Sequence, residues 1–158
     1  MGLFKKKCKA LYAMANGTSV AMKDVPDEVF SQNMMGEGIA IQPNEGLIYA
    51  PCDGEISMVM ERTLHAVGIV NEDGMELLIH IGLDTVELSG EGFESFVKAG
   101  DKVYKGDLLI RYDKAMIMEK GLNDITMLVI CDANGHVPTQ FYPNEQVSVA
   151  TSKILEYK

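Results

Sequence analysis

Two apolar segments joined by a short polar turn constrain the fold of this chain more than any other feature. The first runs from Ala66 to Val70 and the second from Glu76 to Ile81. Between them lies Asn71-Glu-Asp-Gly74, whose asparagine and glycine suit the backbone of a tight turn. Both segments are short and rich in β-branched residues, as strands are. The pattern therefore predicts an antiparallel β-hairpin.

Short apolar runs between Gly, Pro, Asn and Asp turns continue along the whole chain, and helical periodicity is scarce. One short helix is predicted at Lys114–Lys120, with Gly121 as its stop signal. The chain is therefore expected to be all-β, an antiparallel β-sandwich or barrel-sandwich hybrid with very short helices. Further strands are predicted at Leu11–Met14, Ser19–Met22, Ile39–Ile41, Leu47–Tyr49, Glu55–Met58, Phe93–Phe96, Gly100–Val103, Leu108–Tyr112, Thr126–Cys131, Val147–Ala150 and Ile154–Tyr157.

The length of 158 residues fits one domain, which we place at residues 11–158 because no linker or low-complexity segment interrupts it. A net charge of −9 disfavours nucleic acid as a ligand and favours a basic protein partner. Cys8, Cys52 and Cys131 have no metal-ligand spacing, and free thiols suit a reducing cytoplasm. No run reaches the roughly 20 apolar residues that span a bilayer.

The start of the chain, Met1–Lys9, joins an apolar tip to four lysines, against the acidic trend of the rest. We assign residues 1–10 to a basic amphipathic tail. One interpretation is a frayed, solvated terminus. The other is a weak contact with a membrane surface, in which Leu3 and Phe4 insert and the lysines meet anionic headgroups.

His80 stands near the end of the second hairpin strand, where the pattern alone would place another aliphatic residue. A lone histidine in such a strand is most often a core residue with one nitrogen bonded to a backbone carbonyl. His65, however, lies just before the first strand. Antiparallel pairing through the turn brings these two ends together, so we expect the two imidazoles to be neighbours.

Two neighbouring histidines suit a metal site, a general acid/base pair, or a phosphorylated histidine with a helper. A metal site needs further ligands, and Asp84 and Glu87 beyond the strand are as well explained as solvated surface, so we expect no metal site within the chain. The two imidazoles could still accept a metal if another protein completed its ligand shell. Phosphoryl transfer fits better, because a nucleophilic imidazole needs one free nitrogen and nearby hydrogen-bond donors, which His65 and Thr63 could supply. An apolar rim would slow hydrolysis. Candidates for that rim are Phe30, Met34, Met35, Val67 and Leu78.

Several stretches of the chain carry a family resemblance. They are HIGLDTVELSGEGF from His80 to Phe93, Thr63-Leu-His-Ala66, VPDEVFSQNMMGEGIAIQP and YAPCDGEI. The chain resembles the glucose-type enzyme IIA of the bacterial phosphoenolpyruvate-dependent sugar phosphotransferase system from about Leu11 to its C-terminus.

The resemblance implies roles for particular residues. His80 would accept the phosphoryl group from the carrier protein HPr, as a tele-phosphohistidine, and pass it to the IIB domain of a sugar permease. His65 would hydrogen-bond that group and Thr63 would orient His65, while Asp27 and Asp84 would face a basic partner. Leu78 and Glu61 stand where some members carry phenylalanine, and His136 matches no family role and is interpreted as a loop residue.

The resemblance further implies a phosphotransferase component that works without a cofactor, as a monomer, in the cytoplasm or at the inner face of the membrane. One alternative is a lipoyl or biotinyl carrier domain, because the segment from Gly100 to Leu109 followed by Tyr112-Asp-Lys-Ala115 resembles a carrier hairpin. Lys114 would then bear the cofactor. Another alternative is a regulatory binding module without phosphoryl chemistry.

Overall fold

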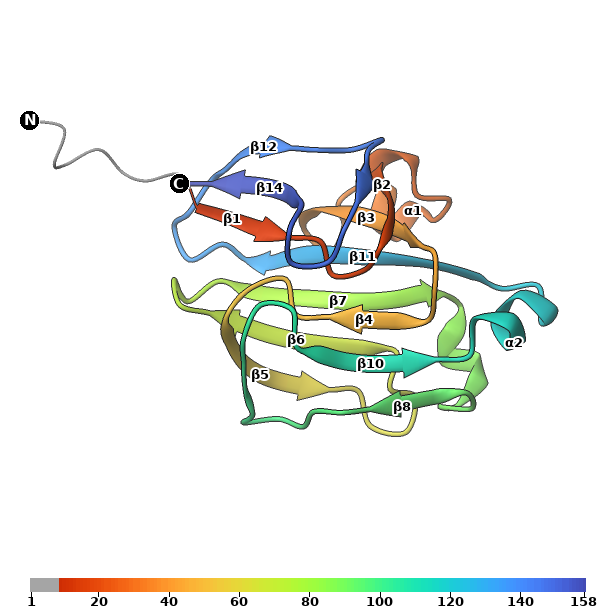
Figure 1. Ribbon diagram of the computed structural model, residues 1–158. Helices are drawn as coiled ribbons and strands as arrows, with labels where there is room; N and C mark the ends of the chain where they lie inside the picture. The colour runs from red at the N-terminus through yellow and green to blue at the C-terminus, as the bar shows by residue number, and fades with distance from the viewer. Residues whose placement is uncertain (1–8) are drawn as a thin grey trace, which may run out of the picture.

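The computed structural model of the chain describes residues 9–158, and its secondary structure is dominated by strands (Figure 1). In chain order the elements are β1 (Lys9–Tyr12), β2 (Gly17–Ala21), the 3₁₀ helix η2 (Met22–Asp24), α1 (Glu28–Ser31), β3 (Glu37–Pro43), β4 (Leu47–Tyr49), β5 (Gly54–Val59), β6 (Ala66–Asn71), β7 (Glu76–Leu83), the 3₁₀ helix η3 (Thr85–Leu88), β8 (Phe93–Ser95), β9 (Lys102–Val103), β10 (Leu108–Tyr112), α2 (Lys114–Glu119), β11 (Asn123–Asp132), β12 (Pro138–Phe141), β13 (Gln146–Val147) and β14 (Lys153–Tyr157).

The strands form three antiparallel sheets. The largest has eight strands in the order β13-β2-β3-β11-β7-β6-β5-β9, and two three-stranded sheets have the orders β1-β14-β12 and β4-β10-β8. The smaller sheets lie against the large one, so that aliphatic side chains of both are enclosed between them. The prediction of an antiparallel all-β fold with very short helices is confirmed.

The hairpin that constrains the fold is formed by β6 and β7. Ala66 pairs with His80 and Val67 with Ile79, so the register places the two histidines at the same end. In the turn, the side-chain oxygen of Asn71 accepts hydrogen bonds from the backbone N–H groups of Asp73 and Met75, each at 3.0 Å. An asparagine that bonds its own backbone in this way fixes the turn, and with it the register.

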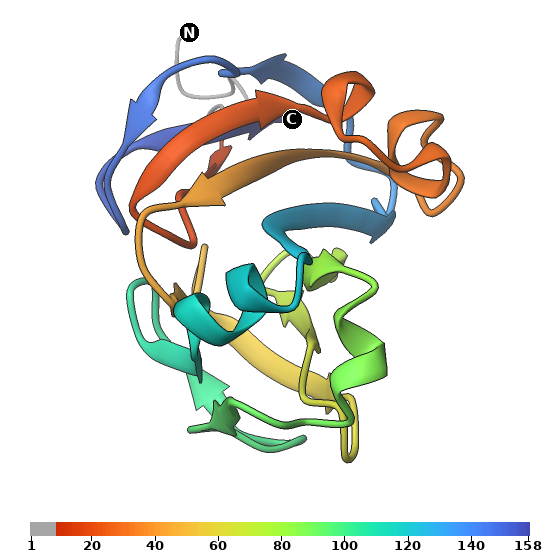
Figure 2. The ribbon, with the colours of Figure 1, turned by 90° about the vertical axis from the view of Figure 1, so that its right-hand side faces the viewer.

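Strand β11 lies at the centre of the large sheet, between β3 and β7, and residues 124–130 are all buried. Its alternate side chains enter two separate cores. The main core lies between the sheets and contains Leu128 and Ile130. A smaller core contains Met127 and Val129 and is covered by η2 and α1, which lie beside the ends of β3 and β11 in Figure 2. This second core matters for function because it borders His80.

Several segments differ from the sequence-based expectation. The predicted strands Leu11–Met14 and Ser19–Met22 end earlier, at Tyr12 and Ala21, and Met22 lies in η2. Helix α1 was not expected, because four residues are too few to show a helical period. Asp27 caps its N-terminus by accepting a hydrogen bond from the Val29 N–H at 2.9 Å. Strand β12 was not expected either, because its side chains are at most half-buried and leave no apolar pattern. The predicted strand at Val147–Ala150 is wrong beyond Val147, where the chain turns.

Residues 1–8 of the predicted tail lie outside the described residues. Lys9 and Ala10, expected to belong to that tail, instead lie in β1 and pair with β14. The ammonium group of Lys9 also binds the Asp73 carboxylate at 2.6 Å, which ties β1 to the β6–β7 turn. Within residues 9–158 no helix is long and apolar enough to cross a membrane.

Candidate functional site

The centre of the site is the pair of histidines. His80 lies on β7, and His65 lies one residue before β6. Their ring centroids are 4.9 Å apart and the rings are nearly perpendicular, at 88°. The backbone supports this arrangement, because the N–H of Ile81 donates to the carbonyl of His65 at 2.7 Å. The hairpin therefore brings the two imidazoles together as expected.

Thr63 is held close to His65 by the loop between β5 and β6. Its hydroxyl oxygen is 2.8 Å from Nδ1 of His65, a hydrogen-bond distance. The loop is closed at its base by the Met60 N–H, which donates to the Ala66 carbonyl at 2.9 Å. Since a threonine hydroxyl can donate or accept, Thr63 can select which His65 nitrogen carries the proton.

Burial keeps both imidazoles neutral. Desolvation, reinforced by the neighbouring His65, lowers the pKa of His80 to about 4, although the backbone of Gly82 and the carboxylate of Asp27 oppose the shift. Desolvation also lowers the pKa of His65. At neutral pH each ring therefore retains a lone pair on one nitrogen, which is the form a nucleophile requires.

The two ring nitrogens of His80 differ in their surroundings. Nδ1 is buried and has no hydrogen-bond partner of normal geometry among residues 9–158. The side chain as a whole is only partly buried. Nε2 is therefore the nitrogen through which the ring reaches the surface.

A shallow depression of about 210 Å³ lies beside His80. The Phe30 ring forms one wall, with its centroid 5.0 Å from that of His80. Of the other expected rim residues, Met35 lines the depression, Met34 is exposed nearby in sequence but does not line it, and Leu78 is half-buried against the second core. The depression is lined by Asp27, Val29, Phe30, Met35, His80, Leu83, Asp84 and Val86.

Val67 does not belong to the rim, and its assignment there is wrong. It is fully buried in the main core, opposite Ile79 in the β6–β7 register. Side chains alternate between the two faces of a strand, so Val67 and Ile79 point to the face opposite that of His80. Pairing Ala66 with His80 and counting one residue along β6 excludes Val67 from the rim.

Both acidic residues expected at the site are there. Asp27 caps α1 and Asp84 follows β7 directly, and both line the depression. The sequence reasoning missed Val29 and Val86, which are exposed beside them. Val29 is adjacent to Phe30 and Val86 is two residues after Asp84, and both of those neighbours were predicted to lie at the site. This closeness in sequence is the one feature that could have identified the two valines.

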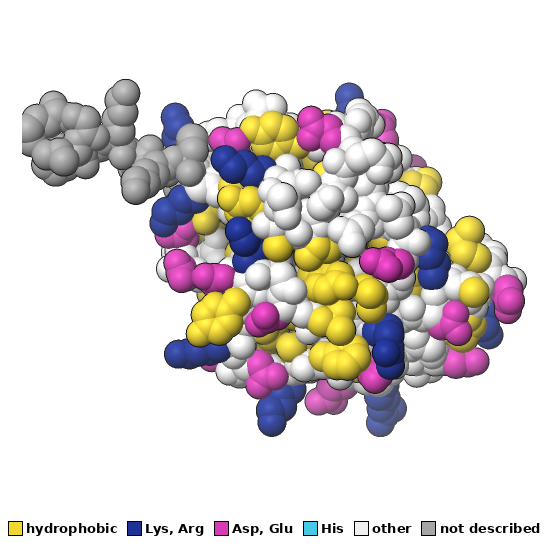
Figure 3. All heavy atoms as spheres, in the orientation of Figure 1, with side chains coloured by type: hydrophobic (Ala, Val, Ile, Leu, Met, Phe, Trp, Pro, Cys, Tyr) yellow, Lys and Arg dark blue, Asp and Glu magenta, His cyan; other side chains and the backbone are white. Residues whose placement is uncertain are grey.

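Among residues 9–158, no three His, Cys, Asp or Glu side chains are grouped so that they could hold a metal ion. His136 lies in the loop between β11 and β12, as expected, and its ring packs edge-on against Tyr157 at 5.5 Å. No histidine is visible on the face of the molecule in Figure 3, where hydrophobic side chains gather in the lower centre and acidic and basic side chains are scattered around them.

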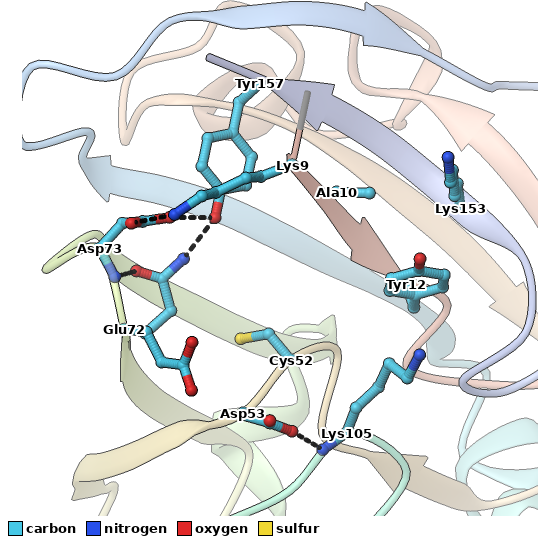
Figure 4. Close-up of a pocket in the computed structure, with 11 residues that line it drawn as sticks. Lys9, Ala10, Tyr12, Cys52, Asp53, Glu72, Asp73, Lys105, Lys153 and Tyr157 are labelled. Atoms are coloured by element: carbon cyan, nitrogen blue, oxygen red, sulfur yellow. Dashed lines mark hydrogen bonds and ion pairs between the residues drawn. The ribbon is translucent and has the colours of Figure 1, made fainter. Parts of the chain in front are cut away.

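A larger cavity, of about 370 Å³, contains none of the expected site residues (Figure 4). Two of the lysines that line it have partners within the cavity. Lys9 pairs with Asp73, and the ammonium of Lys105 lies 3.9 Å from the centre of the Tyr12 ring. Burial, aided by nearby carboxylates, raises the pKa of the Cys52 thiol to about 12, so the sulfur is neutral and unreactive.

Lys114, the residue that would bear a lipoyl or biotinyl group, is engaged inside the fold. Its ammonium binds the buried Asp124 carboxylate at 2.7 Å and the Pro43 carbonyl at 3.0 Å. The residue lies in the first turn of α2, not at a hairpin tip. Modification would require these contacts to break.

Comparison with known proteins decides between the alternatives. Residues 9–135 match the family model described as phosphoenolpyruvate-dependent sugar phosphotransferase system, EIIA 1. The chain belongs to this family. Its fold is also similar to the solved structure of glucose permease IIA from Mycoplasma capricolum, at 33% identity and a TM-score of 0.88, with 97% of each chain covered. The structural match covers more of the chain than the family model, which ends at residue 135.

As an EIIA of the phosphotransferase system, the chain is a phosphocarrier in sugar uptake. The lipoyl or biotinyl interpretation is not favoured, which agrees with the engaged state of Lys114. The similarity of the carrier hairpin reflects architecture, and architecture alone does not carry function.

Proposed function

We propose that Nε2 of His80 accepts the phosphoryl group from HPr and passes it to the IIB domain of a sugar permease. The supporting observation is the state of His80, which is neutral, covered at Nδ1 and located between His65 and an apolar depression. A proton on the buried Nδ1 leaves the lone pair on Nε2. That lone pair is the group that attacks phosphorus.

His65 assists the transfer by donating a hydrogen bond to a phosphoryl oxygen. For Nε2 of His65 to carry the proton, its Nδ1 must accept, and the Thr63 hydroxyl 2.8 Å away can be the donor. Thr63 thus selects the tautomer. The bond from the Nε2–H of His65 to a negatively charged oxygen is stronger than one between neutral groups.

The acceptance step exchanges one phosphorus–nitrogen bond for another. The bond between phosphorus and the HPr imidazole breaks while the bond to Nε2 of His80 forms; in the donation step the bond to Nε2 breaks while a bond to the acceptor group of IIB forms. Because similar bonds form and break in the acceptance step, that exchange is close to isoenergetic and reversible. The task of the protein is then mainly positioning and charge stabilisation.

The partners dock on the rim of the depression. Met35, Val29 and Val86 offer exposed apolar contact beside His80, and Asp27 and Asp84 offer negative charge to a basic HPr surface. Phe30 forms the buried wall of the depression, and Met34 and Leu78 remain candidates for contact outside it. A small apolar area with a charged edge suits a brief encounter. The protein acts as a monomer of one domain, which includes Lys9 and Ala10 of β1, in the cytoplasm, with residues 1–8 making at most weak contact with the membrane surface.

The experiment that tests this function is phosphorylation with phosphoenolpyruvate, enzyme I and HPr, followed by measurement of acid-labile phosphate. We expect the wild-type protein and His136→Gln to be labelled fully, and His80→Gln not at all. His136 is the matched control because it is the third histidine and lies outside the site. Full labelling of His80→Gln would refute the assignment.

The same assay separates acceptance from donation. We expect His65→Gln to accept the phosphoryl group from HPr but to pass it to IIB at least tenfold more slowly, a loss on the order of that for one charge-stabilising donor. Unchanged donation by this variant would remove His65 from the mechanism while leaving the role of His80 intact.

A further inference from the structure

The segment that follows His80 returns to the loop that carries Thr63. Strand β7 ends at Leu83, η3 occupies Thr85–Leu88, and Ser89 and Gly90 follow with φ angles of +53° and +88°. At Gly90 the chain is so close to the β5–β6 loop that a Cβ atom there would lie 2.0 Å from the carbonyl oxygen of Arg62. Only glycine fits this position without displacing the loop.

The loop on the other side of this contact is itself unusual. Arg62 and Leu64, the two neighbours of Thr63, both have left-handed backbones, with φ angles of +67° and +55°. Such a conformation is unfavourable for residues other than glycine and persists only where the surroundings enforce it. Two contacts enforce it here. The Leu64 N–H donates to the Met60 carbonyl at 2.9 Å, and the backbone of Gly90 packs against the Arg62 carbonyl.

We infer that Gly90 is a positioning residue for phosphoryl transfer, because its close contact with the Arg62 carbonyl holds Thr63 in hydrogen-bond contact with His65. The inference rests on the proposed roles of Thr63 and His65. The two histidines are thus linked twice, once by the β6–β7 pairing and once by the segment through η3 and Gly90. The second link fixes the tautomer and orientation of His65 and not merely its location.

The test compares three glycine variants. Gly90→Ala must displace the Arg62 carbonyl, and with it Thr63. Gly121→Ala introduces the same backbone strain, since its φ is +71°, but its Cβ meets nothing within 4 Å. Gly92→Ala lies in the same segment, but its Cβ meets the flexible end of Met116 at 2.4 Å.

The first readout is the ¹⁵N NMR spectrum of the His65 ring, which reports its tautomer at a temperature where each variant is folded. We expect Gly90→Ala to shift these signals in the direction produced by Thr63→Val, and the double variant to show no further shift. Gly121→Ala and Gly92→Ala should match the wild type. Unchanged His65 signals in Gly90→Ala would overturn the inference.

The second readout is donation of the phosphoryl group to IIB. A misplacement of about 1 Å at a reacting centre can cost up to about a hundredfold, so we expect Gly90→Ala to donate on the order of tenfold or more slowly while still accepting from HPr. If Thr63→Val slows donation but Gly90→Ala matches Gly121→Ala, the positioning role is wrong and the proposed function stands. If both variants shift the His65 signals without slowing donation, the proposed role of His65 fails instead.

A measurement on the unmodified protein covers the case in which Gly90→Ala does not fold. The contact predicts a nuclear Overhauser effect between an α-proton of Gly90 and the α-proton of Thr63, because a Cβ at Gly90 would lie 3.9 Å from the Thr63 Cα. Observation of this effect supports the contact. Its absence would overturn the inference without any variant.

Discussion

At the scale of single residues, the reactivity of His80 comes from where its two nitrogens lie. A neutral imidazole in water exchanges its proton between both nitrogens, whereas here Nδ1 is buried and the His80 side chain lines the depression. Burial also lowers the pKa of the ring to about 4, so protonation does not compete with phosphorylation at neutral pH. The same burial makes folding sensitive to acid.

The stability of the fold should therefore fall as His80 is forced to take up a proton. Because its pKa is about 4 when folded and about 6.5 when unfolded, the unfolded chain binds the proton more readily between these values. The free energy of unfolding should be unaffected by His80 above pH 6.5 and decrease as the pH falls toward 4. Allowing for partial exposure, the loss is about 2–3 kcal/mol.

Urea titrations of the wild type and His80→Gln at pH 7 and pH 4 measure this loss. Carboxylate protonation affects both proteins alike, so the difference between them isolates His80. We expect the wild type to lose about 2–3 kcal/mol more than the variant over this range. Equal losses in the two proteins would show that the folded and unfolded pKa values of His80 do not differ.

The sequence predicted those parts of the site that depend on strand pairing in the β6–β7 hairpin. His65 and His80 were predicted to be neighbours, because a two-residue period and a recognisable turn fix the register. Thr63 was named as a nearby donor, and its role in orienting His65 came from the family resemblance. The assignment of Val67 to the rim was wrong because it rested on apolar character alone and ignored which face of the strand the side chain lies on. The surroundings of each His80 nitrogen and the contact at Gly90 depend on segments distant in sequence, so no local pattern encodes them.

At the scale of elements, a buried carboxylate adds a polar link between helix α2 and the sheets to the apolar burial of Ile117. Asp124 on β11 accepts hydrogen bonds from Gln42 at 2.7 Å and from the Tyr112 hydroxyl at 2.8 Å, and it pairs with Lys114 at 2.7 Å. Burial and this carboxylate raise the pKa of Tyr112 well above its usual value. The network joins β3, β10, α2 and β11 at one point.

Removal of this carboxylate should destabilise the whole fold. Asp124→Ala leaves three donors without their partner, and Asp124 is only 1% exposed, while the Lys114 side chain is 30% exposed and can partly reach water. Breaking a buried pair costs about 3–5 kcal/mol. Because Lys114 can be partly hydrated, we expect the free energy of unfolding to fall by about 2–4 kcal/mol. Urea unfolding measures the change.

The matched control is Glu94→Ala, which removes the exposed ion pair with Arg111 at 2.7 Å. Exposed pairs contribute less than about 1 kcal/mol, so this variant should unfold close to the wild type. If the two variants lost similar amounts of stability, the buried network would contribute no more to the fold than an exposed ion pair.

The elements also show where sequence patterns are informative. Long central strands such as β7 and β11 were predicted because they are buried and rich in aliphatic residues. Helix α2 was predicted from its Gly121 stop signal, and Asp113 begins it by capping the Met116 N–H at 3.0 Å. Short or exposed elements such as α1 and β12 carry neither signal, and tertiary contacts alone define them.

At the scale of the whole molecule, the site lies where a hairpin in the large sheet meets a small second core. The second core contains Phe30 and Leu83, both of which also line the depression beside His80. The packing that stabilises this corner of the fold thus also shapes the surface that a partner meets. The acidic total charge of −9 favours approach by a basic carrier.

The most direct measurement is to locate the phosphoryl group on the phosphorylated protein. A ¹⁵N-labelled sample is phosphorylated with phosphoenolpyruvate, enzyme I and HPr, and the histidine ring nitrogens are assigned by NMR. We predict one phosphorus–nitrogen bond, at Nε2 of His80, with the proton retained on Nδ1. A phosphoryl group on Nδ1 of His80, on His65 or on any other residue would contradict the mechanism.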